Sequence, residues 1–221
     1  MIKETVLSLK DVNYRYKDAK KDEYVLRDIN YGFKKGKTYA IKGRSGSGKT
    51  TLLSLISGLE KNYEGEIRYK NRSLKRMDLD NYRSKNIGIV FQSYNLLPHL
   101  TALENIVLSM DVSKVKVKDK KKLASKLVEE VGLDSSMNNR RILKLSGGEQ
   151  QRIAIARSLS YNPEIILADE PTGNLDRETE NEIMKIFNTL AHEQDKCIII
   201  VTHSQNVCDS VDEVYELKKR K

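Results

Sequence analysis

The chain has 221 residues, a hydrophobic fraction of 38% and a formal net charge of +9. This length can bury one sizeable core, no apolar run approaches the ~18 residues of a membrane span, and the first residues do not begin a signal peptide. Cys197 and Cys208 have neither a disulfide framework nor metal-site spacing, so we expect two buried thiols in a reducing compartment.

The positive charge is concentrated at residues 68–76, 114–122 and 218–221. These runs lack interleaved aromatic residues and any nucleic-acid reading motif, and lysine-rich solvated faces are ordinary. We therefore expect no nucleic-acid partner. An anionic membrane surface nearby would also favour such charge.

The first 91 residues are predicted to form short strands around one long helix. The expected strands cover residues 5–10, 24–33, 38–42, 66–70 and 87–91. The helix is expected in the segment TLLSLISGL, where Leu52, Leu53, Ile56 and Leu59 follow a helical period.

Between the strand at 38–42 and this helix stands GRSGSGKT, residues 43–50, which fits the phosphate-loop pattern G-x-x-x-x-G-K-[ST]. Strand, glycine loop and helix are the context that this motif requires. Backbone amides from Ser45 to Lys49 would surround the β-phosphate, and Lys49 would reach the β- and γ-phosphate oxygens. The Thr50 hydroxyl would bind Mg²⁺.

Residues 93 to about 160 are predicted to be helical. Thr101 is a candidate helix cap with Glu104 in the first turn, and Leu123, Leu127 and Val131 are spaced as on one helix face. The octet LSGGEQQR, residues 145–152, leads into a helix expected over 150–160. Free N–H groups at such a helix start bind anions, although serine and two glycines could also serve only as a helix cap.

From residue 164 onward, alternating strands and helices indicate a parallel sheet with crossover helices. The residues Ile165 to Ala168 are all apolar, which indicates a strand buried on both faces. Asp169 and Glu170 follow at its C-terminal end, where α/β sheets bind ligands. Asp169 would hold Mg²⁺ through its water shell, and Glu170 would activate the attacking water. The alternative is a solvated acidic turn.

These motifs resemble those of the nucleotide-binding subunit of ABC transporters, and the resemblance covers essentially the whole chain. Residues 43–50 resemble the Walker A motif, 145–152 the signature, 165–170 Walker B with its catalytic glutamate, and 173–176 the D-loop. The resemblance implies that Gln92 is the Q-loop glutamine and His203 the switch histidine. It also implies that Tyr16 stacks on adenine, although Tyr14 is two residues away on the same expected strand face.

The resemblance implies ATP and Mg²⁺ as cofactors, with Thr50, Gln92 and Asp169 as the residues that bind the metal. The implied catalytic residues are Glu170, His203, Gln92 and Lys49. The implied ATP-binding residues are Tyr16, Gly43, Arg44, Ser45, Gly46, Ser47, Gly48, Lys49, Thr50, Thr51, Gln92, Ser146, Gly147, Gly148, Glu149, Asp169, Glu170 and His203.

The implied fold class is α/β: a P-loop NTPase ABC-ATPase fold in one domain, residues 1–221. Residues 1–92 and 161–221 would form a RecA-like core with an N-terminal antiparallel β subdomain, and 93–160 an inserted helical subdomain. In this family the phosphate loop and the signature of one subunit do not face each other. A homodimer is therefore implied, with two ATP molecules between head-to-tail copies.

The segments 91–97, 103–106 and 168–176 are typical of the MacB/LolD/FtsE branch. The resemblance implies a separate FtsX/MacB-like transmembrane permease and a peripheral position on the cytoplasmic face of the membrane. It also implies export or extraction of peptides, antibiotics or lipoproteins. The segments 12–17 and 29–31 are similar to Gram-positive peptide exporters.

Two alternative functions are considered beside transport. The same engine could regulate a cell-wall hydrolase, as in FtsE, without transport. A soluble ABC ATPase acting on DNA or ribosomes normally needs two cassettes or a long coiled-coil insertion, and neither occurs here.

The segment 94–100 could receive the permease, or its leucines could be core residues. Family members usually continue beyond the strand at 212–217 with a further hairpin strand, which we expect to be missing here.

Overall fold

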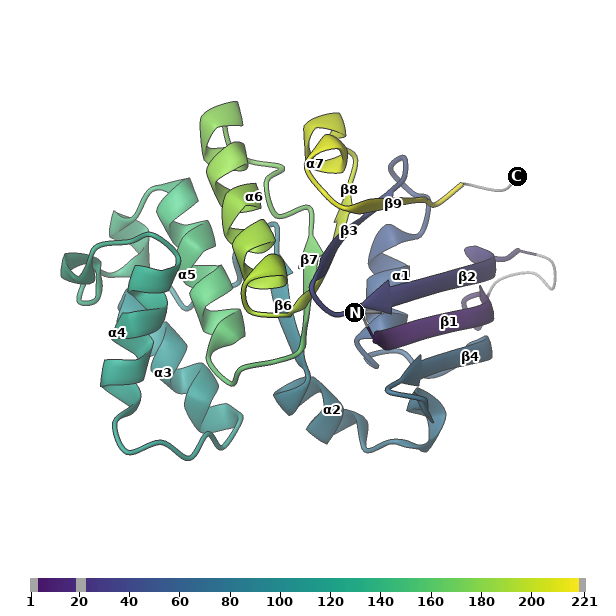
Figure 1. Ribbon diagram of the computed structural model, residues 1–221, viewed down its shortest axis with the longest axis horizontal. Helices are drawn as coiled ribbons and strands as arrows, with labels where there is room; N and C mark the ends of the chain where they lie inside the picture. The colour runs from purple at the N-terminus through teal and green to yellow at the C-terminus, as the bar shows by residue number, and fades with distance from the viewer. Residues whose placement is uncertain (1–3, 19–22, 219–221) are drawn as a thin grey trace.

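The computed structural model describes residues 4–18 and 23–218, which form two β-sheets and a group of helices on one side (Figure 1). The antiparallel sheet has the strand order β2-β1-β4-β5, and the parallel sheet has the order β6-β7-β8-β3-β9. The strands are β1 (Thr5–Tyr14), β2 (Leu26–Lys34), β3 (Lys37–Lys42), β4 (Glu64–Tyr69), β5 (Arg72–Ser73), β6 (Ile87–Phe91), β7 (Ile165–Asp169), β8 (Cys197–Thr202) and β9 (Glu213–Glu216). The helices are α1 (Lys49–Ile56), α2 (Leu79–Lys85), α3 (Ala102–Val112), α4 (Lys120–Glu130), α5 (Gly147–Leu159), α6 (Arg177–His192) and α7 (Gln205–Asp209).

The parallel sheet determines where the polar residues of the motifs meet. Its registers pair Phe91 with Asp169, Asp169 with Val201, and Thr202 with Lys42. The C-terminal ends of β6, β7, β8 and β3 therefore lie at one edge of the sheet. The residues that directly follow these strands, Gln92, Glu170, His203 and Gly43, are thereby gathered from four distant parts of the chain.

Strand β7 illustrates why this sheet is stable. Alternate residues of a strand point to opposite faces, and all apolar residues of β7 are buried. Ile165 and Leu167 face a core formed with α1 and the antiparallel sheet, whereas Ile166 and Ala168 face a second core formed with helices α3 to α6. The expectation of a strand buried on both faces is confirmed. Cys197 and Cys208 are buried free thiols, also as predicted.

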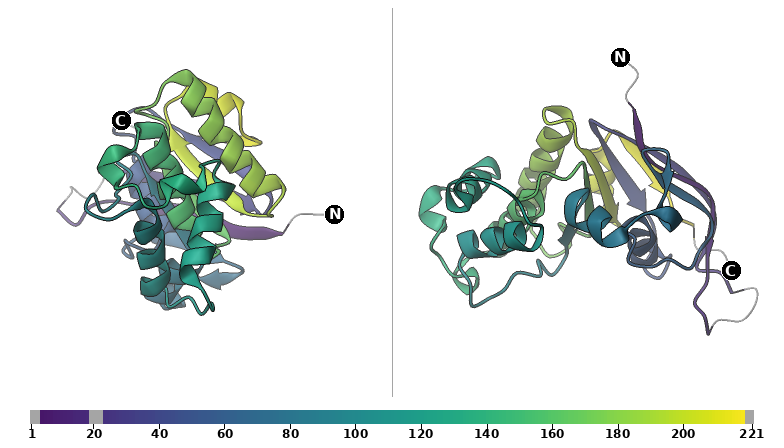
Figure 2. Two further views of the ribbon diagram at one scale, coloured as in Figure 1. Left: turned by 90° about the vertical axis from the view of Figure 1, so that its left-hand side faces the viewer. Right: turned by 90° about the horizontal axis from the view of Figure 1, so that it is seen from below.

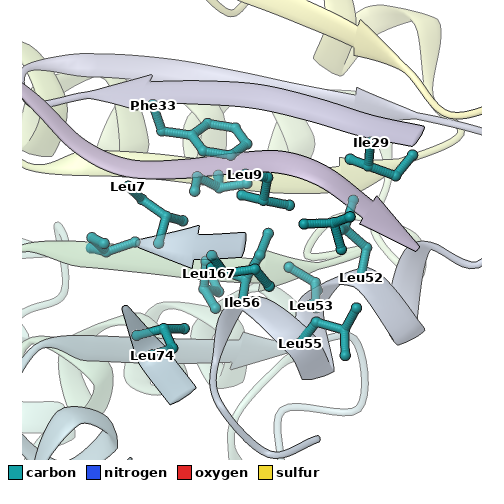
Figure 3. Close-up of a cluster of buried hydrophobic side chains, with 14 of the residues drawn as sticks. Leu7, Leu9, Ile29, Phe33, Leu52, Leu53, Leu55, Ile56, Leu74 and Leu167 are labelled. Atoms are coloured by element: carbon teal, nitrogen blue, oxygen red, sulfur yellow. The ribbon is translucent and has the colours of Figure 1, made fainter. Parts of the chain in front are cut away.

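The first core joins the two sheets. Leu7, Leu9 and Phe33 of the antiparallel sheet pack with Leu52 and Ile56 of α1, as Figure 3 shows. This packing holds α1, and with it the phosphate loop at its start, between the sheets. Burial of such aliphatic side chains stabilises the fold by about 1.5–3 kcal/mol each.

Helices α3, α4 and α5 form the second, helical region, which lies to one side of the sheets in Figure 1 and in the right-hand view of Figure 2. The predicted cap at Thr101 is confirmed, because its hydroxyl accepts from the Glu104 amide and Glu104 accepts from the Thr101 amide. Leu127 and Val131 are buried, and Leu123 packs against the same core. Within residues 4–18 and 23–218, no helix is both long enough and apolar enough to cross a bilayer.

Several element boundaries differ from the expectations. The helix after the phosphate loop has only eight residues, because Ser57 ends it and Gly58 adopts φ 71°. Leu59, expected on its apolar face, is 60% exposed instead. Helix α2, capped by Asp78, was not predicted. Strand β1 continues to Tyr14 through irregular pairing, and α5 begins at Gly147 rather than at residue 150.

Candidate functional site

The phosphate loop curls around the side chain of Lys49. The Lys49 ammonium donates to the carbonyl oxygens of Gly43 at 2.8 Å and Arg44 at 3.3 Å. Gly48, which immediately precedes α1, has φ 92°, and a Cβ atom there would lie 2.9 Å from Val25 Cγ1. Glycine is therefore required for both backbone conformation and space. The amides of the loop and the Lys49 ammonium therefore lie at the start of α1, where an anion can bind.

Two carboxylates stand opposite this loop. The Thr50 hydroxyl donates to Asp169 Oδ2 at 3.3 Å, and Lys49 Nζ lies 3.4 Å from Glu170 Oε1. Burial raises the pKa of Asp169, the neighbouring charge of Glu170 raises it further, and the hydrogen bond from Thr50 opposes both. A hydroxyl and a carboxylate at this separation are the hard oxygen ligands that Mg²⁺ prefers.

Glu170 has an unusual backbone conformation. Its φ of 45° lies in the left-handed region, which non-glycine residues rarely adopt. The conformation is held by a hydrogen bond from the Glu170 amide to the Val201 carbonyl and by another from the Gly173 amide to the Glu170 carbonyl. The chain turns sharply at the end of β7, and the Glu170 side chain is directed toward the phosphate loop.

His203 and Gln92 complete the edge of the sheet. His203 Nδ1 lies 2.9 Å from Glu170 Oε2, and the His203 amide donates to the same oxygen at 3.3 Å. Gln92 Nε2 donates to Asn174 Oδ1 at 3.3 Å, which connects the residue after β6 to the segment after β7. The predicted catalytic residues of this strand edge thus lie together around one pocket.

The pocket has a volume of about 800 Å³. Ser47, expected at the site, is buried beneath the loop and does not line it, and neither does Gly43. Val25, which no sequence motif indicates, does line it. The lining residues are Tyr16, Val25, Arg44, Ser45, Gly46, Gly48, Lys49, Thr50, Thr51, Gln92, Asp169, Glu170 and His203.

The two tyrosines at the end of β1 have different environments. Tyr14 is the last residue of the strand, is 5% exposed and donates to Glu60. Tyr16 lies beyond the strand end, is 54% exposed and has its hydroxyl 3.2 Å from Thr51 Oγ1 at the pocket. The expectation that both share a strand face is therefore wrong, because β1 ends between them. Their rings meet edge to face, with centroids 5.2 Å apart.

The residues Ser146 to Glu149 form the start of α5 and do not line this pocket. The Ser146 hydroxyl accepts from the Glu149 amide at 3.3 Å, and Glu149 Oε2 accepts from the Ser146 amide at 2.7 Å. Ser146 is thus a helix cap, while the first helical amides, those of Gly147 and Gly148, have no partner within the helix. A Cβ atom at Gly148 would lie 2.6 Å from Thr179 Cγ2 of α6, so close packing also requires glycine.

The family model described as ABC transporter matches residues 26–173, the stretch that carries the phosphate loop, the octet and both carboxylates. The chain belongs to the ABC transporter family. This ABC transporter subunit binds and hydrolyses ATP, and its α/β fold of one antiparallel and one parallel sheet is the ABC ATPase fold, as the resemblance implied.

Individual relatives cover nearly the whole chain. The uncharacterized ABC transporter ATP-binding protein YclH of Bacillus subtilis is 43% identical over 94% of this chain and 91% of its own length. The lipoprotein-releasing system ATP-binding protein LolD of Francisella tularensis is 40% identical over 97% of this chain and 94% of its own. A dimeric post-hydrolysis structure of the cassette MJ0796, bound to ADP and Pi, is 38% identical. It superimposes with a TM-score of 0.86 over 96% of this chain and 94% of that one.

Proposed function

We propose that two copies of this ABC ATPase bind ATP head to tail and thereby drive a separate membrane permease. The observation that carries the proposal is a separation within one chain. Lys49, Glu170 and His203 line one pocket, whereas the anion-binding helix start at Ser146 does not. A second copy can supply that helix start to the open side of the pocket. The dimeric structure of the related cassette MJ0796 supports this arrangement.

The positions of several pocket residues support a role for each of them. Lys49 and the loop amides bind the β- and γ-phosphates, and the exposed ring of Tyr16 stacks on adenine. Thr50, Asp169 and Gln92 would hold Mg²⁺, which would neutralise charge on the phosphates. From the partner copy, Ser146 and the amides of Gly147 and Gly148 contact the γ-phosphate, with Glu149 fixing the helix start.

Glu170 accepts the proton of the attacking water and fixes its orientation. His203 lies beside the same carboxylate and donates toward the γ-phosphate and the water. Because ATP joins the two copies, the closed dimer is stabilised only while the γ-phosphate is present. The difference in affinity between open and closed states is what drives a conformational change in the permease.

The permease and its cargo are proposed from the relatives. LolD is named for lipoprotein release, which supports extraction or export of lipoproteins or peptides, or of antibiotics, through an FtsX/MacB-like permease. The ATPase would then be peripheral, on the cytoplasmic face of the membrane. An FtsE-like regulator of a cell-wall hydrolase would use the same ATPase. Co-purification with a wall hydrolase would favour that alternative over transport.

The segment 94–100 is the proposed docking site for the permease. Leu97 is 39% exposed, whereas Leu96 packs against the helical core. The side chain of Asn105, itself buried, accepts from the Leu97 amide at 2.8 Å and donates to the Leu97 carbonyl at 3.2 Å. An apolar side chain is thus held outward on a fixed loop. Leu97→Glu should abolish co-purification with the permease and leave ATP binding intact, whereas equal recovery of the permease would contradict docking here.

The test of the proposed function is the variant Glu170→Gln. It should bind ATP and accumulate as a dimer with almost no turnover, measured by size-exclusion chromatography and phosphate release with ATP and Mg²⁺. Removal of a general base costs about 10²–10⁴-fold in rate. A variant that stays monomeric with ATP, or that hydrolyses ATP at the wild-type rate, would refute the assignment.

A further inference from the structure

Glu180, in the first turn of α6, accepts hydrogen bonds from two segments that are distant in the sequence. Its Oε2 atom accepts from the Thr172 hydroxyl at 2.8 Å, and its Oε1 atom accepts from the Asn206 side-chain amide at 2.7 Å. Glu180 does not line the ATP pocket. Its two carboxylate oxygens therefore bridge the segment after β7 and helix α7, which follows β8.

Both hydrogen-bond partners of Glu180 are close in sequence to a residue of the site. Thr172 follows Glu170 by two positions and is 4% exposed, in the turn closed by the hydrogen bond from the Gly173 amide to the Glu170 carbonyl. Asn206 follows His203 by three positions, in α7. A displacement of either segment would therefore move the Cα atom of Glu170 or of His203, and the side chain with it.

The direct contact between these two site residues is weakly constrained. His203 Nδ1 lies 2.9 Å from Glu170 Oε2, but the His203 side chain is 67% exposed and has little packing to fix its rotamer. The connection through Glu180 is better constrained, because Thr172 is buried and Asn206 Nδ2 also donates to Asn181 Oδ1 at 2.9 Å. The backbone behind the site is thus tied more firmly than the side chains in front.

We propose that Glu180 is a positioning residue that sets the separation of Glu170 and His203 for hydrolysis. The inference rests on the catalytic roles proposed for those two residues. It assigns Glu180 to the chemical step and not to ATP binding, because neither Thr172 nor Asn206 lines the pocket.

Glutamine at this position can keep both hydrogen bonds. Its amide oxygen can accept from Asn206, and its amide nitrogen can donate to the Thr172 hydroxyl, which is able to act as an acceptor. Alanine removes both bonds. Glu178 offers a matched control, because it is an exposed acid in the same turn and its side chain has no hydrogen bond or ion pair with the residues that the structure describes.

The test compares kcat and the KM for ATP in these variants. Glu180→Ala should lower kcat about tenfold or more with KM near the wild-type value. Glu180→Gln should keep most of the wild-type kcat, and Glu178→Ala should have the same kcat as the wild type. The inference is overturned if Glu180→Ala keeps its kcat, if the loss is in KM, or if Glu180→Gln is as slow as Glu180→Ala.

A second set of variants covers the case in which Glu180→Ala does not fold. Thr172→Val and Asn206→Ala each break one arm of the bridge, so each should lower kcat, and the double variant should lose less than the sum of the two free-energy effects. Fully additive losses would contradict a shared bridge. Glu170→Gln, assayed in parallel, separates the two claims. If that variant is inactive while the bridge variants are normal, only the inference about Glu180 fails. Wild-type hydrolysis by Glu170→Gln would refute the proposed function itself.

Discussion

Lys49 Nζ lies 3.4 Å from Glu170 Oε1, and both side chains are largely buried, with 10% and 14% of their surface exposed. The lysine proposed to bind the phosphates is therefore paired with the proposed general base. ATP must compete with this carboxylate for the lysine, and the carboxylate repels the incoming phosphates. We therefore expect the pair to keep ATP affinity below what the loop alone would give.

This relationship predicts a gain of affinity in Glu170→Gln, separate from its loss of turnover. The neutral amide removes both the competition and the repulsion, so the Kd for ATP should fall severalfold in a calorimetric titration. A gain on the order of 1 kcal/mol corresponds to about fivefold in Kd. Glu178→Gln should leave the Kd unchanged. An unchanged or weaker affinity in Glu170→Gln would mean that the carboxylate does not oppose phosphate binding.

Tyr16→Ala should weaken ATP binding about tenfold, because stacking of an aromatic ring on a base contributes about 1–3 kcal/mol. Tyr16→Phe should bind nearly as well as the wild type, since the ring remains and only the contact with Thr51 is lost. Tyr14→Ala should instead lower the melting temperature, because that ring is buried. If the affinity loss is found in Tyr14→Ala with an unchanged melting temperature, the two tyrosines have been assigned the wrong way round.

Gly48→Ala should reduce ATP affinity by about tenfold or more, since a side chain at φ 92° is strained and would meet Val25 and Leu26. The loop would shift, and its amides would no longer converge on the phosphate. Gly32→Ala is the matched control, because a Cβ atom there meets nothing within 4 Å. Equal affinities of the two variants in a nucleotide titration would argue against the loop geometry.

Glu164 provides a prediction about stability and pH. Burial alone would raise the pKa of this carboxyl, but hydrogen bonds from Lys35, Lys70 and Tyr69 outweigh burial and lower the pKa from 4.5 to about 2. Because the folded-state value lies below the ordinary one, the carboxylate stabilises the fold above about pH 4.5. That contribution is lost as the pH falls from 4.5 toward 2.

The variant Glu164→Gln should therefore have a lower free energy of unfolding at pH 7, by on the order of 2 kcal/mol, in urea titrations. The difference from the wild type should shrink as the pH is lowered below about 4.5. Glu129→Gln, which removes an exposed acid on α4, should show neither effect. A difference that stays constant between pH 7 and pH 3.5 would show that the ionised form of Glu164 is not what stabilises the fold.

Much of the site could be predicted because its residues directly follow buried strands. Parallel strands bring their C-terminal ends to one edge, so Gln92, Glu170 and His203 had to lie together once the strands were identified. The phosphate loop could be predicted for the same reason, since its glycine spacing is a backbone requirement.

Other features depend on tertiary positions that a sequence pattern does not encode. The roles of Tyr14 and Tyr16 depend on where β1 ends, and irregular pairing with β2 carries the strand to Tyr14. Val25 is a single apolar residue whose importance comes only from contact with the loop. The bridge at Glu180 requires α6 and α7 to be side by side. Leu59 was misplaced because Ser57 and Gly58 ended the helix early.

Mixing two inactive variants shows whether each ATP is held by two copies. Lys49→Ala removes the lysine proposed to bind the phosphates, and Ser146→Arg blocks the helix start. Each variant alone should form no complete site and hydrolyse almost no ATP. A mixture of equal amounts should recover at least about a quarter of the wild-type rate, because random pairing makes half of the dimers mixed and each mixed dimer has one complete site. A mixture that stays inactive, although each variant is folded, would show that a second copy does not complete the site.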